Sequence, residues 1–222
     1  MMNPIRHPNR HLADRTRRRA LEIGATALGA VALPLPALAR VLGPVAAPAA
    51  TPRLTDGPFY PVAFDREPVT SLIVGALAPD ARPLQLAGRI VDRSGRPVAG
   101  SRIEIWQCDA HQHYRHPSDG GGMAVDRGFA GFGWQAAGTD GAYRFETIRP
   151  VAYPGRTPHI HVKVKVDGRT ALSSQIFMPD EAAANQRDFL WRSLGAEDRP
   201  LILATLARDG ASDVARFDIV LG

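Results

Sequence analysis

The stretch HIHVKVKV, which covers His159–Val166, alternates polar and apolar side chains along its whole length. A period of two is typical of a β-strand that presents different side chains on its two faces. Asp167-Gly168 follows directly and is a strong signal for a two-residue hairpin turn. The segment ALSSQIFM after the turn predicts the returning strand, so this part of the chain predicts an antiparallel pair.

Strand and turn signals continue on both sides of this pair. The predicted strands are LQLAGRIVD around Gln85, SRIEIWQC over Ser101–Cys108, AYRFETI after Thr139-Asp140-Gly141, and RFDIVL near the C-terminus. Helical patterns occur only between Asp180 and Asp209, around EAAANQRDFLWRSL and RPLILATLA. Glycine and proline, at 21 and 19 of the 222 residues, also disfavour a helix bundle. We therefore expect an all-β chain, an antiparallel β-sandwich with long loops at its functional site and minor C-terminal helical turns.

The net charge of +5 comes entirely from the first 40 residues, which hold seven arginines and two acids. Residues 41–222 carry 20 basic and 20 acidic residues. The sequence pI near 10.0 therefore does not indicate a nucleic-acid-binding surface, and we expect no nucleic-acid partner.

The N-terminal segment has the layout of a secretory signal peptide. It contains Thr16-Arg17-Arg18-Arg19, then a weakly apolar run, then the small-x-small triplet Ala37-Leu38-Ala39. The arginines resemble a twin-arginine signal, although Ala20 and Glu22 depart from that motif. The general secretory route and an uncleaved tail are the alternatives. The apolar run is too short and too broken by proline to predict a membrane span.

Three regions follow from these patterns. We expect residues 1–39 to be the signal peptide, residues 40–84 a linker and arm, and residues 85–222 the β-sandwich domain that carries the chemistry. The mature protein would then be periplasmic or secreted, without a stable membrane span. The mass of its mature N-terminus would test this, since an intact Met1 in the cytosol would contradict export.

Histidine and tyrosine are the residues best able to carry chemistry. His159 and His161 stand two positions apart on a strand, so both imidazoles point to one face and could chelate one metal ion. Taken alone, such a pair is more often exposed or hydrogen-bonded. The rigid turn Tyr153-Pro154-Gly155-Arg156-Thr157-Pro158 brings a tyrosine and an arginine to the same strand end. The single cysteine, Cys108, excludes a Cys-based zinc or iron–sulfur site.

A tyrosine binds a metal as phenolate, and its ordinary pKa of about 10 means that a strongly Lewis-acidic ion is needed. A hard trivalent ion such as Fe(III) suits phenolate oxygen. Tyr114, on the loop after the Ser101–Cys108 strand, is the candidate for a second tyrosine ligand. Tyr143 lies in an alternating strand and is expected to be a core residue.

The sequence resembles the intradiol ring-cleavage dioxygenases, the family of protocatechuate 3,4-dioxygenase and catechol 1,2-dioxygenase. The resemblance spans nearly all of the chain after the leader, in the expected order. The matching stretches are GPFYP (Gly57–Pro61), GRIVDRSGRPVAGSRIEIWQCDAHQHYRH (Gly88–His116), TDGAYRFETIRPVAYPGRTPHIHVKV (Thr139–Val166) and SSQIFM (Ser173–Met178).

This resemblance implies one mononuclear non-haem Fe(III) per chain, held by Tyr114, Tyr153, His159 and His161. It also implies that Arg156 stabilises developing negative charge, that Tyr153 accepts a substrate proton, and that Gln175 lies near the iron. The implied reaction uses O2 to cleave a catechol-type ring between its two hydroxyl-bearing carbons, which gives a muconate-type diacid.

Each of these assignments has a structural alternative. Tyr114 could be a core aromatic, Arg156 a surface ion-pair partner, and Gln175 an ordinary strand amide. The family motif gives no ligand role to the remaining loop histidines, which we expect near the mouth of the pocket: His111, His113 and His116. We expect Cys108 to be a buried thiol and not a nucleophile.

Two departures from the family bear on substrate and assembly. The long N-terminal helical segments that catechol 1,2-dioxygenases use for dimerisation are absent, so the chain resembles the compact protocatechuate-type subunit. Trp134 and Gln135 are bulkier than the residues of family members and could shape the pocket. Catechol, protocatechuate, hydroxyquinol and larger lignin-like catechols all remain candidate substrates. A homo-oligomer, or a partner subunit that completes the pocket, is also possible.

A second function class fits the first two-thirds of the mature chain. VDRSGRPVAG followed by TDGAYRF also describes carboxypeptidase-regulatory-like and transthyretin-like sandwich modules, which bind or space other domains and hold no metal. Such a module has no need of two tyrosines, an arginine and a histidine pair at these spacings. These residues therefore favour the enzyme.

Overall fold

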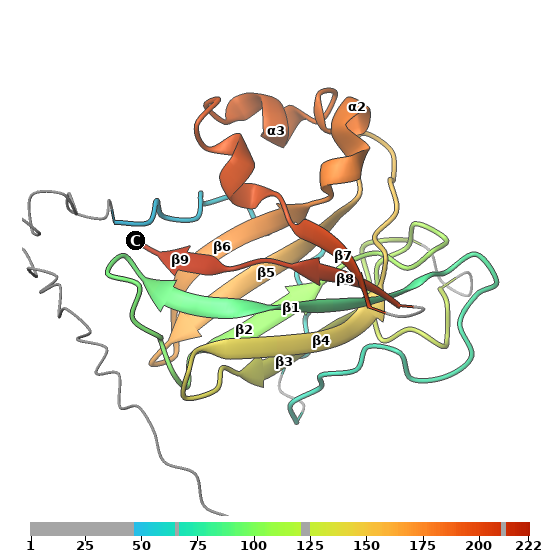
Figure 1. The fold of residues 1–222 in the computed structure, drawn as a ribbon. Helices are drawn as coiled ribbons and strands as arrows, with labels where there is room; N and C mark the ends of the chain where they lie inside the picture. Colours follow the sequence, from blue (N-terminus) through green and yellow to red (C-terminus); the bar gives the residue numbers. More distant parts are fainter. Residues whose placement is uncertain (1–46, 65–66, 121–124, 210–211) are drawn as a thin grey trace, which may run out of the picture. The chain divides into compact units, whose positions relative to one another are not determined.

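The structure is a computed structural model that describes residues 47–64, 67–120, 125–209 and 212–222. Within these ranges nine strands form two sheets that pack face to face (Figure 1). The predicted signal peptide, residues 1–39, lies outside the described residues. No helix in the same ranges is long and apolar enough to cross a membrane.

The strands in chain order are β1 (Pro83–Asp92), β2 (Arg102–Trp106), β3 (Phe132–Ala136), β4 (Ala142–Ile148), β5 (His159–Val166), β6 (Arg169–Phe177), β7 (Thr205–Asp209), β8 (Ser212–Arg216) and β9 (Ile219–Leu221). The first sheet has the order β4-β1-β8-β7, with β9 also paired to β1. The second sheet has the order β3-β2-β5-β6. Short helical pieces join β6 to β7, namely η2 (Pro179–Glu181), α2 (Ala182–Asn185), α3 (Phe189–Ser193) and η3 (Arg199–Ile202).

The alternation of polar and apolar side chains along β5 explains how the second sheet packs against the first. Ile160, Val162 and Val164 face inward and are 0% exposed. They share one core cluster with Leu84 and Leu86 of β1. Burial of these apolar side chains between the sheets is the main favourable term in folding. The predicted all-β sandwich is confirmed.

One part of the first sheet differs from the prediction, because the sandwich is not purely antiparallel. β8 and β9 both pair with β1 in parallel, as shown by the partners Leu84↔Asp213 and Ile90↔Ile219. The C-terminal segment therefore crosses back along β1 in the same direction as that strand. A gap between the two parallel pairings falls at Phe217, whose backbone N–H donates to the Ala87 carbonyl.

Two strand predictions are confirmed to the residue, whereas the single strand predicted over RFDIVL is wrong, because β8 ends at Arg216 and β9 begins at Ile219. AYRFETI and HIHVKVKV are β4 and β5 with the predicted bounds. The helix predicted in RPLILATLA stops at Ile202, and the chain continues as β7, which pairs with β8. The strand β3 was not predicted. It forms because its backbone pairs with β2 from Phe132↔Trp106 to Ala136↔Arg102.

The part of the predicted arm from Thr51 to Phe64 packs along the second sheet, whereas Leu72 of the same arm lies in the sandwich core. The Leu54 N–H donates to the Ser173 carbonyl of β6 at 2.9 Å, and Lys163 of β5 forms an ion pair with Asp56 at 2.6 Å. The helical pieces pack on the same sheet, since Trp191 of α3 and Ile202 of η3 cluster with Phe177 of β6. Both segments therefore cover the face of the second sheet that points away from the core.

Gly88 of β1 provides a test of the crossing between β1 and the C-terminal segment. A Cβ at this position would lie 1.9 Å from the Phe217 carbonyl oxygen and 2.9 Å from the Tyr143 hydroxyl. We expect Gly88→Ala to lower the free energy of unfolding by about 3 kcal/mol, because backbone must move to make room. Gly95→Ala is the control, with a φ of 79° and no atom within 4 Å of its Cβ. It should cost about 1 kcal/mol, from backbone strain alone. Equal midpoints in urea for the two variants would contradict this view of the crossing.

Candidate metal centre

The two histidines lie on the outer face of the second sheet. Because side chains alternate along β5, His159 and His161 point away from the core that Ile160 occupies. Both histidines are nevertheless buried, because the arm and the helical segment cover this face. The expected placement of both imidazoles on one face is therefore observed, and the pair is not exposed.

The two imidazole rings face each other through their Nε2 atoms, which are 3.1 Å apart. Burial lowers the pKa of His159 to about 3 and the pKa of His161 well below its usual value, so both rings are neutral near pH 7. His159 Nδ1 lies 2.7 Å from the Thr157 carbonyl, which assigns the proton to Nδ1 and the lone pair to Nε2. His161 Nδ1 is buried without a hydrogen-bond partner.

Two tyrosines complete the cluster. The Tyr114 ring lies 5.7 Å from the Tyr153 ring and 6.0 Å from the His161 ring, measured between centroids. Tyr153 lies 5.5 Å from His159 in the same way. Tyr114 is buried and its hydroxyl has no hydrogen-bond partner, whereas Tyr153 is half-buried. Burial raises the pKa of both phenols, so each is a neutral phenol without a bound cation.

Local turns place each tyrosine. Asp109 organises the loop after β2, because its Oδ1 accepts hydrogen bonds from the His111 and His113 N–H groups and its Oδ2 accepts one from the Asp126 N–H. Tyr114 follows that turn directly. Tyr153 lies in a tight turn in which the Arg156 N–H donates to the Tyr153 carbonyl, and Gly155 supplies a φ of 79°.

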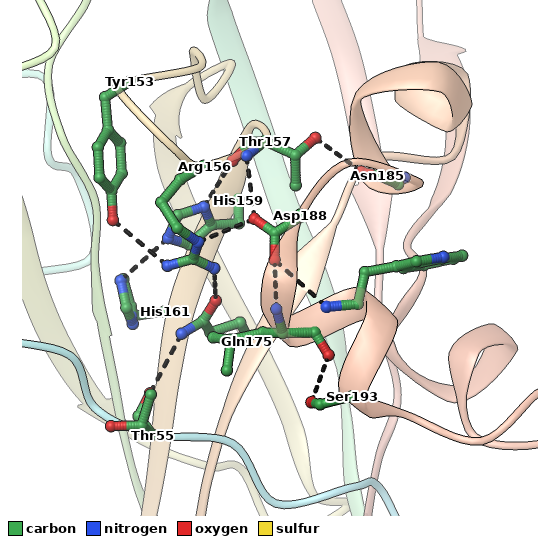
Figure 2. A network of polar contacts seen from close by, with 12 residues as sticks. Thr55, Tyr153, Arg156, Thr157, His159, His161, Gln175, Asn185, Asp188 and Ser193 are labelled. Atoms are coloured by element: carbon green, nitrogen blue, oxygen red, sulfur yellow. Dashed lines mark hydrogen bonds and ion pairs between the residues drawn. The ribbon is translucent and has the colours of Figure 1, made fainter.

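Arg156 is the centre of a polar network beside the histidines (Figure 2). Its Nη1 donates to the Tyr153 hydroxyl at 3.3 Å, and its Nη2 donates to Gln175 Oε1. Gln175 lies opposite His161 in the β5–β6 register and donates from Nε2 to the Thr55 carbonyl. The structure thus brings the six predicted site residues together, and it gives Arg156 a buried ion-pair partner, Asp188, that sequence reasoning missed.

Aromatic residues of the arm and of β2 cover the histidines and Tyr114. Sequence reasoning did not predict this covering layer. Trp106 of β2 stacks on His161 with ring centroids 4.8 Å apart and an angle of 11°. Phe59 stacks on Tyr114 at 4.8 Å. Gly57 lies so close to His161 that an added Cβ would be 3.3 Å from Cε1. The sequence stretch that could have predicted this layer is GPFYP, because its glycine lies against His161 and its phenylalanine stacks on Tyr114.

Tyr114 also lines a cavity of about 870 Å³. Its walls include Trp134 and Phe132 of β3 and the loop residue His116. Of the six predicted site residues, only Tyr114 lines it. The suggestion that Trp134 shapes a pocket is therefore supported. Gln135 is not a lining residue, and its side chain donates to the Arg144 carbonyl instead.

His113 and His116 make local contacts in the loop after β2, and His116 also lines the cavity. His113 Nδ1 contacts Asp119 Oδ2 at 3.0 Å, and His116 Nδ1 accepts from the Ser118 N–H. Burial raises the pKa of the Cys108 thiol to about 12, which fits the predicted inert thiol. Within the described ranges, no group of three or more His, Cys, Asp and Glu residues is arranged to hold a metal.

The cluster of two histidines and two tyrosines fits a hard trivalent cation. The two imidazole Nε2 atoms converge, and the buried Tyr114 hydroxyl has no hydrogen-bond partner. Unpaired buried polar atoms are costly in a native fold unless a ligand satisfies them. Two imidazole nitrogens and two phenolate oxygens form a donor set that suits Fe(III).

Comparison with known proteins identifies the family of this chain. A family model described as "Dioxygenase" matches residues 56–222. The chain is 30% identical over 181 residues to the protocatechuate 3,4-dioxygenase alpha chain of Burkholderia cepacia, covering 76% of this chain and 90% of that one. It is 33% identical to the beta chain from the same organism, covering 61% of this chain but only 63% of the beta chain.

A solved structure supports the same relationship. The dioxygenase domain of a dioxygenase carbohydrate-binding protein fusion from Streptomyces sp. SirexAA-E has a TM-score of 0.63 and 32% identity, and covers 78% of this chain and 98% of that domain. The alternative of a metal-free sandwich module is not favoured by these matches. A sandwich with this cluster on its second sheet, matched over residues 56–222, therefore belongs to the intradiol ring-cleavage dioxygenases.

Proposed function

We propose that this chain is an Fe(III)-dependent dioxygenase that cleaves a catechol-type ring between its two hydroxyl-bearing carbons. The observation that carries the proposal is the convergence of His159, His161, Tyr114 and Tyr153 on the outer face of the second sheet. The relatives' names, which include protocatechuate and hydroxyquinol dioxygenases, support a catechol-type substrate.

These four side chains would hold one iron per chain. Bound there, Fe(III) would supply the Lewis acidity that binds a catechol through its oxygens and makes the ring reactive toward O2. The buried pair His159 and His161 and the buried Tyr114 would be the permanent ligands. Each comes from a segment fixed by packing or backbone hydrogen bonds.

Tyr153 differs from the other three because it is half-buried and contacts Arg156. It would hold the cation as phenolate, and this oxygen, once free of its own proton, would be the group that accepts one of the substrate's protons. Arg156 Nη1 lies 3.3 Å from this oxygen, so the guanidinium would face the substrate where its charge develops. A fixed positive donor at that place stabilises negative charge in the transition state.

A panel of catechols tests the proposal. The protein reconstituted with ferric iron should consume O2 with at least one of catechol, protocatechuate or hydroxyquinol and produce the ultraviolet absorption of a muconate-type diacid. Removal of iron by a chelator should abolish O2 uptake. An iron-loaded protein that consumes no O2 with any of these compounds would contradict the proposed activity.

Tyr114→Phe tests the ligand set against Tyr143→Phe. Both tyrosines are 3% exposed, but the Tyr143 hydroxyl donates to the Phe217 carbonyl, whereas the Tyr114 hydroxyl is unpartnered. We expect Tyr114→Phe to lose most of its iron and the visible tyrosinate-to-iron absorption. Tyr143→Phe should keep both and lose about 1 kcal/mol of stability. Full iron occupancy in Tyr114→Phe, measured by metal analysis, would show that Tyr114 is not a ligand.

Arg156→Met tests the charge-stabilising role against Arg149→Met. Arg149 forms an ion pair with Asp180 at the start of the helical segment and touches none of the predicted ligands. We expect Arg156→Met to keep its iron and lower kcat by roughly 10²–10³-fold, as for one removed electrostatic stabiliser. Arg149→Met should keep the wild-type kcat. Loss of iron in Arg156→Met would instead make Arg156 a structural residue of the Tyr153 turn.

A further inference from the structure

Asp188 joins the helical segment to the turn that carries Arg156. Its carboxylate is fully buried, with a side-chain exposure of 0%. Oδ1 accepts from the Leu190 and Trp191 N–H groups and so caps α3 at its first turn. Oδ2 accepts from Arg156 Nε at 2.8 Å and from the Thr157 N–H at 3.1 Å. One carboxylate therefore serves two segments, with one oxygen for each.

The contact with Asp188 fixes the direction of the whole Arg156 side chain. A guanidinium is planar and rigid, so an acceptor on Nε sets where Nη1 and Nη2 point. With Nε held by Asp188, Nη1 reaches Tyr153 and Nη2 reaches Gln175 (Figure 2). The Arg156 side chain is only 8% exposed, so water offers few competing partners.

A second contact holds the same turn without touching Arg156. Thr157 Oγ1 lies 2.7 Å from Asn185 Oδ1, and Asn185 Nδ2 donates to the Met178 carbonyl at 2.9 Å. Asn185 is as buried as Asp188. Asn185 therefore attaches the turn without touching the arginine, whereas Asp188 holds both the turn and the arginine.

We propose that Asp188 is a positioning residue, which holds the Arg156 guanidinium so that Nη1 faces the Tyr153 hydroxyl. It acts through Arg156 and contacts none of the four predicted ligands. The inference deepens the proposed function and rests on it, because the consequence for turnover exists only if Arg156 faces the substrate.

Asp188→Ser separates the two roles of the carboxylate. A serine is a good N-cap residue, so its hydroxyl can still accept from the first N–H groups of α3. It is too short to reach Arg156 as well, and it carries no charge. Asn185→Ala is the matched control, since it loosens the turn and leaves the contact between Asp188 and Arg156 in place.

We expect Asp188→Ser to retain the iron and to lower kcat about tenfold to a hundredfold, as for a displaced catalytic group. KM should change little. Asn185→Ala should lower the unfolding midpoint and keep kcat within about threefold of the wild type. In an Arg156→Met background, Asp188→Ser should lower kcat no further, because contacting residues that act as a unit are not additive. Equal, additive losses in the two backgrounds would overturn the proposal.

A second readout needs neither metal nor turnover. In the full chain labelled with ¹⁵N-arginine and freed of metal, the Arg156 Nε–H signal is identified by its absence from Arg156→Met. The Arg156 Nε–H proton should exchange slowly with solvent in the wild type and in Asn185→Ala, and quickly in Asp188→Ser. A slowly exchanging signal in Asp188→Ser would refute the positioning role. If the wild type turns over no catechol, the proposed function fails, and this measurement still decides whether Asp188 holds Arg156.

Discussion

Strand β5 is covered on both faces, and this constraint determines where the site can lie. Its inward residues close the sandwich core, so the alternation of the strand forces His159 and His161 onto the opposite face. That face would otherwise be in water. The arm from Thr51 to Phe64 and the helical segment after β6 bury it instead, which makes the two imidazoles neutral and able to bind a cation.

The covered outer face of the second sheet also carries charged side chains, and a buried charge is costly unless it is paired with an opposite charge or hydrogen-bonded. Glu104 of β2 is buried and accepts from Arg102, Lys165 and the Tyr60 hydroxyl, while Lys163 pairs with Asp56. These contacts hold the arm against the sheet beside the histidines. Tyr60 in turn meets the edge of Trp106, the ring that stacks on His161. The arm is therefore part of the support for the candidate metal centre.

Most of the strands and three of the four candidate ligands could be predicted from the sequence because their signals are local. The two-residue period of His159–Val166 and the turn before it place three of the ligands within nine residues of one another. β3 and β7 were missed because their short sequences become strands only through pairing. The partner of β3 is β2, which is distant in sequence, and the partner of β7 is β8, which was not predicted either. Asp188 was missed because its role depends on Arg156, 32 positions away. From the sequence alone, an aspartate before an apolar run indicates only a helix N-cap. In the structure Asp188 caps α3 in the middle of EAAANQRDFLWRSL, so the helix predicted there is divided in two.

The claim that two histidines and two tyrosines from separate segments hold one ion is tested most directly by anomalous diffraction. Crystals of the iron-loaded protein would be measured on both sides of the iron absorption edge. The account predicts a single difference peak per chain, in contact with His159 Nε2, His161 Nε2 and the hydroxyl oxygens of Tyr114 and Tyr153. A peak on the loop histidines His111, His113 or His116, or no peak at the cluster, would contradict it.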